Sequence, residues 1–168
     1  MNKYSLWLLP PKQIQLEYSE IVEKYSKKLN FPSFEPHVTI IGEFEGKKND
    51  VVSKISSVLN KSSKIAINIS EISISTTFFQ CVFARINPTP RIIDLQMNIS
   101  LALNLKNSNF FMPHISLVYG EYPSVVKYKI AKEINLKTKE FQAEKLCLIN
   151  ANDYDPETWE HVAEFTLK

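Results

Sequence analysis

The chain has 168 residues, of which 44% are hydrophobic and 23% are charged, and its formal net charge is +2. This length suits one well-packed domain, or two small lobes that share an interface. The small net charge argues against the dense basic surface with which proteins usually bind long nucleic acids, although a small anionic substrate remains compatible with it.

The sequence carries no pattern of a targeting or membrane-spanning segment. The apolar run in residues 1–10 is too short for a signal peptide, and no stretch approaches the roughly 20 apolar residues that cross a bilayer. With three glycines there is no glycine-rich phosphate loop. Cys81 and Cys147 lie in apolar segments, which is typical of free buried thiols in a reducing compartment; a disulfide between them stays open. We therefore expect a cytoplasmic protein.

The first half of the chain predicts a strand, an amphipathic helix, a strand that contains a histidine, a second helix and another strand. These elements are expected at about 3–9, 11–29, 34–44, 50–60 and 65–74. In the histidine strand, the pattern puts Val38 and Ile40 on one face and His37, Thr39 and Ile41 on the other.

In the strand expected at 65–74, the alternation of apolar and polar residues changes phase part-way along. The isoleucines at 65, 67 and 69 alternate, and those at 72 and 74 alternate in the opposite phase. A bulge or bend at Ser70-Glu71 would account for this change.

The second half repeats the same order of elements. A strand, a helix that begins with an N-cap and Pro90, a second histidine strand, a helix and two strands are expected at about 78–86, 90–103, 111–119, 124–134, 139–149 and 160–167. No low-complexity segment or linker separates the halves. We expect a single domain over 1–168 with two pseudo-symmetric lobes, whose motifs lie at 36–40 and 113–117.

Two near-copies of one motif contain two of the three histidines. In Phe34–Phe44 and Phe111–Tyr122, Phe, Pro, His, Thr or Ser, Gly, Glu and an aromatic residue recur in the same order, and Tyr119 is the one inserted residue. A histidine and a hydroxyl residue two positions apart lie on the same face of a strand. Two such strands that face a cleft would bring His37, Thr39, His114 and Ser116 into one site.

This set of side chains suits phosphoryl chemistry. Imidazole titrates near pH 6.5, so one ring can act as a base while the other acts as an acid. The base would deprotonate an attacking water and the acid would protonate the leaving oxygen on the opposite side of a phosphorus atom. Thr39 and Ser116 can donate hydrogen bonds to the non-bridging phosphoryl oxygens.

Other interpretations of these residues remain. Both histidines could be core residues of duplicated strands, kept for packing. A zinc or iron site usually needs three or more ligands, and near the motifs the sequence offers only the carboxylates of Glu35, Glu43 and Glu121. We interpret His161 as a surface or strand-packing residue. Ser116 lacks the strained strand-to-helix turn of a serine nucleophile.

The paired histidine motifs on a duplicated α+β chain resemble the 2H phosphoesterase superfamily. Flanking residues are similar to its cyclic phosphodiesterase branch, and the resemblance covers essentially the whole chain. The segments that carry it are Ser5–Pro10, Phe34–Thr39, Phe79–Phe83 and Met112–Gly120.

The resemblance implies an α+β fold of two antiparallel sheets that face each other across a cleft, with helices outside. It also implies metal-independent hydrolysis of 2',3'-cyclic nucleotides to 2'-phosphates, or of ADP-ribose 1'',2''-cyclic phosphate, with His37 and His114 catalytic. By analogy His114 would be the base and His37 the acid. Trp7 and Tyr119 match aromatic positions on the nucleotide side of the cleft, although their own contexts also fit core packing and strand-end packing.

Two further functions stay open. The chain could belong to another 2H branch, such as RNA 2',5'-ligase-like, RNA-end or cyclic-oligonucleotide phosphodiesterases, which would call for a broader basic rim around RNA ends. It could also be a nucleotide-binding module without turnover. The scattered lysines favour a small nucleotide, and we expect a monomer without membrane partners or cofactors.

Overall fold

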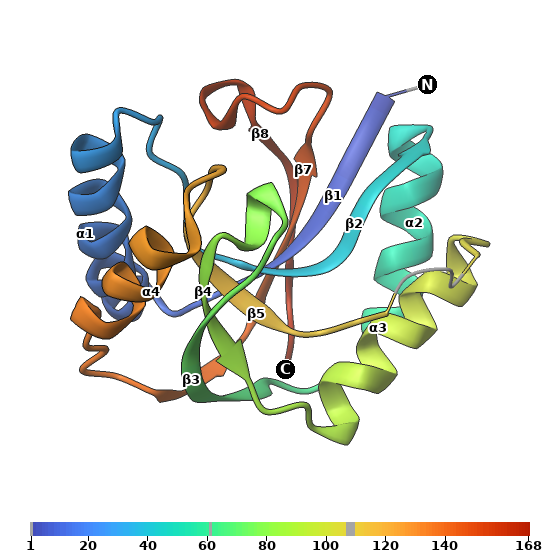
Figure 1. The fold of residues 1–168 in the computed structure, drawn as a ribbon. Coiled ribbons are helices and arrows are strands. Elements are labelled where there is room, and N and C mark those ends of the chain that lie inside the picture. The colour runs from blue at the N-terminus through green and yellow to red at the C-terminus, as the bar shows by residue number, and fades with distance from the viewer. Residues whose placement is uncertain (1, 61, 107–109) are drawn as a thin grey trace.

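A computed structural model of the chain describes residues 2–60, 62–106 and 110–168. In these ranges the fold has four α-helices and eight β-strands (Figure 1). The helices are α1 Lys12–Leu29, α2 Lys48–Leu59, α3 Pro90–Ala102 and α4 Ser124–Glu133. The strands are β1 Asn2–Leu9, β2 Val38–Gly46, β3 Ile65–Ile74, β4 Val82–Ile86, β5 His114–Val118, β6 Glu140–Ala143, β7 Lys145–Asn150 and β8 Glu160–Thr166. Two short 3-10 turns, η1 Phe78–Gln80 and η2 Pro156–Thr158, complete the described structure.

All eight strands form one curled sheet in the order β6-β3-β4-β5-β2-β1-β7-β8, and neighbouring strands are antiparallel. The two antiparallel sheets expected from the resemblance are its two halves, β6-β3-β4-β5 and β2-β1-β7-β8. They meet at β5 and β2, where Val38 lies opposite Ile115. The α+β class predicted from the sequence is confirmed, and the structure adds that the two sheets are continuous.

The two halves of the sheet are built differently from the chain. The half β2-β1-β7-β8 combines the N-terminal strands with the C-terminal ones, and the other half is built from the segment between them. As a result, the strand of each histidine motif, β2 or β5, lies at the junction beside the strand of the other motif. This topology brings the two motifs together.

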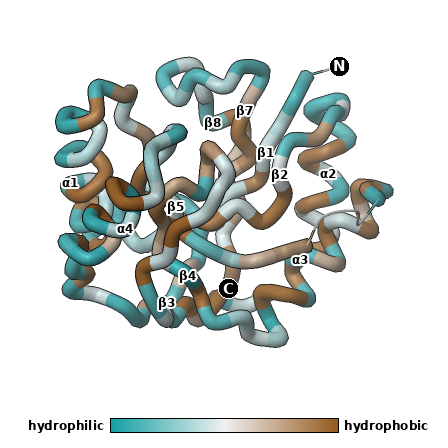
Figure 2. Tube along the Cα trace, in the orientation of Figure 1, coloured by the Kyte–Doolittle hydropathy of each residue, from teal (hydrophilic) through white to brown (hydrophobic). Residues whose placement is uncertain are grey.

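The helices lie outside the sheet as two pairs, α1 with α4 and α2 with α3 (Figure 1). Helix α1 packs against β5, and α3 packs against β2, so each of these helices crosses to the other half of the sheet. Helix α1 buries Tyr18, Val22 and Tyr25 at the helical spacing expected from its sequence. Figure 2 shows the resulting pattern, with hydrophobic strands inside and hydrophilic outer turns on α1.

Two details of the predicted elements are confirmed. The pairing of β3 with β4 shifts register between Ile69 and Glu71, where the change of phase predicted a bulge. Thr89 caps α3 by accepting a hydrogen bond from the backbone N–H of Ile92, and Pro90 follows as the first helical residue.

Three other details were wrong. Ile41 does not share a face with His37: the register of β1 with β2 skips Ile40, so Ile40 and Ile41 both reach the core. Residues 78–80 form the 3-10 turn η1 instead of the start of a strand. The strand expected at 139–149 is interrupted at Glu144, because β6 pairs with β3 whereas β7 pairs with β1.

Cys81 and Cys147 are both buried free thiols. None of the described helices combines the length and the apolar character that crossing a bilayer requires.

Candidate active site

The structure places all six site residues predicted from the sequence around one cavity of about 480 Å³ at the junction of the two sheet halves. They are Trp7, His37, Thr39, His114, Ser116 and Tyr119. The fold therefore brings together both histidine motifs and both predicted aromatic residues, while their chemical roles stay predictions.

Both histidine rings are anchored in the same way. Nδ1 of His37 lies 2.7 Å from the carbonyl oxygen of Glu35, and Nδ1 of His114 lies 2.8 Å from that of Met112. A carbonyl oxygen can only accept, so each Nδ1 carries a proton and each Nε2 is the unprotonated nitrogen of a neutral ring. In both motifs, the chain two residues before the histidine fixes the tautomer that can accept or deliver a proton through Nε2.

Burial sets the electrostatics of the two rings. His37 is buried, and loss of solvation lowers its pKa to about 3, with a smaller contribution from the charge of His114. His114 is half-buried, and desolvation lowers its pKa as well. Both rings are therefore neutral near pH 7 without a ligand. An anionic phosphate between them would favour their protonated forms.

Trp7 lies against the first histidine. Its ring stacks on the His37 imidazole with centroids 3.5 Å apart and planes 3° apart. The indole Nε1 donates to Ser5 Oγ at 2.7 Å, and Ser5 Oγ donates to the Ile41 carbonyl at 3.1 Å. Trp7 is thus both a buried packing residue and a wall of the cavity, so the two interpretations of it are compatible.

Tyr119 is the centre of an aromatic cluster on the other side of the cavity. Its ring stacks on Phe34 with centroids 3.7 Å apart and contacts Phe79 and Trp159 edge-on. Burial raises the pKa of its hydroxyl, which therefore stays protonated and can donate a hydrogen bond. The cluster holds the inserted residue of the second motif at the cavity wall.

The two hydroxyl residues of the motifs differ in their contacts. Ser116 Oγ donates to the carbonyl oxygen of Phe79 at 2.6 Å, while Thr39 is half-buried and lines the cavity. To donate to a phosphoryl oxygen, the Ser116 hydroxyl has to leave the Phe79 carbonyl. A bound phosphate would compete directly with this hydrogen bond.

Comparisons with known proteins show the family to which the chain belongs. The family model described as cyclic phosphodiesterase-like protein matches residues 1–167. The chain belongs to this family of 2H phosphoesterases. A curated relative, the cyclic phosphodiesterase of Arabidopsis thaliana, is 25% identical over 171 residues, covering 98% of this chain and 94% of that protein.

Solved structures of low sequence identity share the fold. E. coli LigT in its apo form has a TM-score of 0.71 at 14% identity and covers 99% of this chain and 98% of its own. The LigT complex with 3'-AMP has a TM-score of 0.68 at 13% identity, with the same coverage. A protein of Thermus thermophilus, TT0787, has a TM-score of 0.68 at 13% identity and covers 98% of this chain and 97% of its own.

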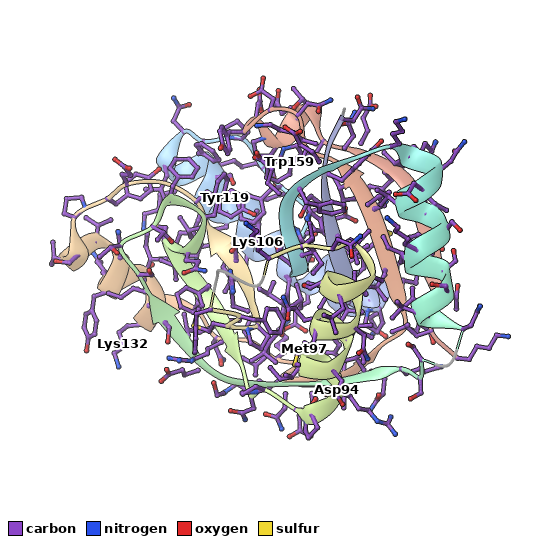
Figure 3. All side chains as sticks on the ribbon, turned by 90° about the vertical axis from the view of Figure 1, so that its right-hand side faces the viewer. Asp94, Met97, Lys106, Tyr119, Lys132 and Trp159 are labelled. Carbon is purple, nitrogen blue, oxygen red and sulfur yellow. The ribbon has the colours of Figure 1, made fainter. Side chains whose placement is uncertain are left out.

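In this cyclic phosphodiesterase-like chain, several wall residues were missed by sequence reasoning. Trp159 contacts Trp7 edge-to-face with centroids 5.4 Å apart, and its Nε1 donates to the Asp153 carbonyl at 2.7 Å. Figure 3 shows Trp159 and Tyr119 on the same side of the molecule. No local pattern marks residues 151–159 as part of the site, because only the pairing of β7 with β1 brings them there. The further wall residues are Ser5, Gly42, Glu43, Phe79, Gln80, Ala151, Asp153 and Tyr154.

The walls of the 2H site are short of positive charge. Among the described residues that line the cavity there is no lysine or arginine, and Glu43 and Asp153 contribute carboxylates. Glu43 pairs with Lys3 at 2.8 Å, and Asp153 accepts a hydrogen bond from the backbone of Tyr154. No group of three or more potential metal ligands occurs in the part of the chain that the structure describes.

A second cavity of about 340 Å³ continues from the first. Thr39, His114 and Gln80 line both cavities, and Gln96 and Lys106 line the second one alone. The site is therefore longer than the space around the two histidines alone.

Proposed function

We propose that the chain hydrolyses 2',3'-cyclic nucleotides to 2'-phosphates, ADP-ribose 1'',2''-cyclic phosphate, or both, through the two histidines and without a metal ion. The observation that carries this proposal is the pair of identically anchored imidazoles, His37 and His114, on one cavity with Thr39 and Ser116. The name of the Arabidopsis relative and the complex of LigT with 3'-AMP support a small nucleotide as the ligand.

In the proposed reaction, the cyclic phosphate lies between the two rings. One Nε2 takes a proton from water as the water oxygen forms a bond to phosphorus. The bond from phosphorus to the 3'-oxygen breaks, and the other ring, protonated when the anionic substrate is bound, gives its proton to that oxygen. The product is a 2'-phosphate with a free 3'-hydroxyl, and a proton exchange with water returns both rings to their starting state.

The difference in burial distinguishes the two roles. A base has to be neutral and an acid has to be protonated before the reaction. His37 is the more buried ring and has a pKa of about 3, so it is the harder ring to protonate. Beside a bound anionic phosphate, His114 is therefore the ring that is protonated more readily. On this ground we assign His114 as the acid, which leaves His37 as the base, the reverse of the assignment by analogy.

The charge around the site favours a small substrate. Lys106 is the single lysine or arginine among the described residues that line the two cavities. A polynucleotide would need a row of such cations along its backbone. The second cavity gives room for a substituent beyond the cyclic phosphate, such as the adenosine diphosphate part of ADP-ribose cyclic phosphate.

Product analysis on a substrate panel tests the proposal. The panel contains 2',3'-cyclic mononucleotides, ADP-ribose 1'',2''-cyclic phosphate, 3',5'-cyclic nucleotides and short RNAs that end in a cyclic phosphate. We expect turnover of one or both of the first two classes, with retention of activity in excess EDTA. Preference for the RNAs would favour the RNA-end branch, and binding without turnover would favour a non-catalytic nucleotide-binding module.

Substitution of each histidine tests the mechanism. His37→Ala and His114→Ala should each lower kcat by about 10²–10⁴-fold, the range of acid–base contributions. His161→Gln serves as a histidine control, since the Gln amide can still donate to Glu35. Near-full activity of either alanine variant would contradict the two-histidine mechanism.

A further inference from the structure

One carboxylate near the active site joins three separate elements. Glu35 lies in the irregular segment 31–37 that leads into β2. Its Oε1 accepts a hydrogen bond from Gln15 Nε2 of α1 at 2.6 Å, and its Oε2 lies 2.6 Å from His161 Nε2 of β8. We call these three residues the Glu35 clamp. Both carboxylate oxygens are used, so the clamp fixes the side chain in two directions.

The same residue holds the catalytic ring through its backbone. The Glu35 carbonyl oxygen accepts the proton of His37 Nδ1 at 2.7 Å. Residues 31–37 lack the regular ladder of hydrogen bonds that would fix this peptide group within a sheet. The orientation of the carbonyl therefore depends on side-chain contacts, and the clamp supplies two of them.

The second motif lacks this device. The position equivalent to Glu35 is Met112, whose carbonyl oxygen accepts the proton of His114 Nδ1 at 2.8 Å. A thioether is only a weak acceptor and cannot make two charge-assisted hydrogen bonds. The two copies of the repeat thus share the backbone contact, whereas the side-chain clamp belongs to the first copy alone.

We propose that Gln15, Glu35 and His161 are positioning residues that hold His37 in its catalytic orientation. The inference rests on the proposed hydrolase function. The clamp fixes the peptide that accepts from Nδ1, and so keeps the proton off Nε2 and the ring parallel to Trp7. The clamp also gives His161, the third histidine of the chain, a role that requires neither a metal ion nor contact with the substrate.

Two substitutions of Glu35 separate positioning from folding. Glu35→Met introduces the residue of the second motif and removes both hydrogen bonds of the clamp. It should lower kcat by about 10- to 100-fold, the scale on which a displaced catalytic group loses rate, and leave KM little changed. Glu35→Gln keeps an acceptor for Gln15 and a group that can bond to His161, so it should retain most of the activity. Glu23→Met, which removes an exposed carboxylate paired with Lys27 on α1, is the matched control and should behave like the wild type.

A measurement without substrate tests the same inference. Nitrogen-15 NMR of the imidazole rings reports which ring nitrogen carries the proton. In the wild type and in Glu35→Gln, His37 should be the Nδ1–H tautomer; in Glu35→Met it should become a mixture, while His114 should not change. Wild-type kcat in Glu35→Met, or an unchanged His37 tautomer there, would overturn the inference.

The inference would also be overturned if Glu35→Met and Glu35→Gln lost kcat equally and in proportion to their drop in melting temperature. That result would indicate that Glu35 has a structural role alone. Failure of the proposed function would look different. The wild type would then turn over no member of the substrate panel, while the NMR comparison would still decide whether the clamp fixes the His37 ring.

Discussion

His37 and His114 occupy equivalent places in the two motifs, yet their surroundings differ. His37 is 7% exposed and is covered by the indole of Trp7, whereas His114 is half-buried and meets Phe83 edge-on. Desolvation lowers both pKa values, and it acts more strongly on His37. The two rings therefore make equivalent hydrogen bonds, but the pKa of His37 is lowered more than that of His114.

The buried state of His37 predicts a dependence of stability on pH. Its pKa is about 3 in the folded chain and near 6.5 when unfolded, so the unfolded state binds more protons between these values. The contribution of His37 to the free energy of unfolding is therefore fully present above about pH 6.5. As pH falls below this value, the free energy of unfolding decreases by up to about 1.4 kcal/mol per pH unit because of this group. Urea unfolding between pH 7.5 and 5.5 measures the slope. His37→Gln should flatten it, and an equal slope in that variant would assign the effect to other groups.

The lowered pKa of the proposed acid predicts the position of the pH–rate profile. The value of kcat/KM reports the pKa of His114 in the free protein, and desolvation puts that pKa below the usual 6.5. The value of kcat/KM should therefore reach its maximum on the acid side of neutrality and fall by about tenfold per pH unit above the pKa of His114. Bound anionic substrate favours imidazolium, so kcat should fall at a higher pH. A flat kcat/KM up to pH 8 would refute this assignment.

The sequence could predict the site residues that lie in the repeated motifs, because two copies of a motif make their shared residues conspicuous. It could not predict that Trp159 lines the site or that His161 contacts Glu35. Trp159 and His161 lie in a C-terminal segment with no repeat, and their contacts depend on strand pairing across the whole chain.

At the scale of elements, the glycines of the two motifs show where the repeat stops being equivalent. Gly120 has φ +130°, and a Cβ there would lie 2.5 Å from Cε2 of Tyr122. The backbone N–H of Gly120 also donates a hydrogen bond to the carbonyl oxygen of Phe78 at 3.0 Å. A Cβ on Gly42, the equivalent residue of the first motif, would meet no atom within 4 Å. The insertion of Tyr119 thus coincides with a tight turn that the first motif does not need.

This contrast predicts unequal effects of alanine at the two glycines. Gly120→Ala should lower the free energy of unfolding by about 1–3 kcal/mol, through backbone strain and the contact with Tyr122. Gly42→Ala is the matched control and should have a small effect. Denaturant unfolding of both variants measures the difference, and similar values for the two would contradict the account of the turn.

Hydrophobic periodicity was sufficient for the type and order of the helices and strands, and for the bulge after Ile69, but it predicted seven strands where the described chain has eight. It was insufficient where pairing between strands decides the result. The register skip at Ile40 turns Ile41 into the core, and the break at Glu144 occurs because β6 and β7 join different halves of the sheet. Neither constraint is encoded in local alternation.

At the scale of the whole molecule, the two lobes are interleaved. Helices α1 and α3 each pack on the half of the sheet opposite to the strand that precedes them, and the chain returns to the first half through β7 and β8. Strands β3 to β6 are consecutive in sequence, but once the covering helices α1 and α3 are included, neither lobe is a continuous part of the chain. The two lobes therefore depend on each other for their cores.

Interleaving predicts one cooperative unfolding transition. The two tryptophans, Trp7 and Trp159, report on one half of the sheet, whereas far-UV circular dichroism reports on all helices. In guanidinium chloride the two signals should give the same midpoint, as expected for two-state unfolding. Separate midpoints would show that the lobes unfold independently.

The pairing of β1 with β7 also has a consequence for the time course of synthesis. Leu9 lies opposite Lys145 and Tyr4 lies opposite Asn150, so β1 leaves the ribosome long before this partner exists. At about 5–20 residues per second, the delay is roughly 7–30 s. Throughout that interval the growing chain presents an apolar strand with one unpaired edge, which is the kind of segment that molecular chaperones bind.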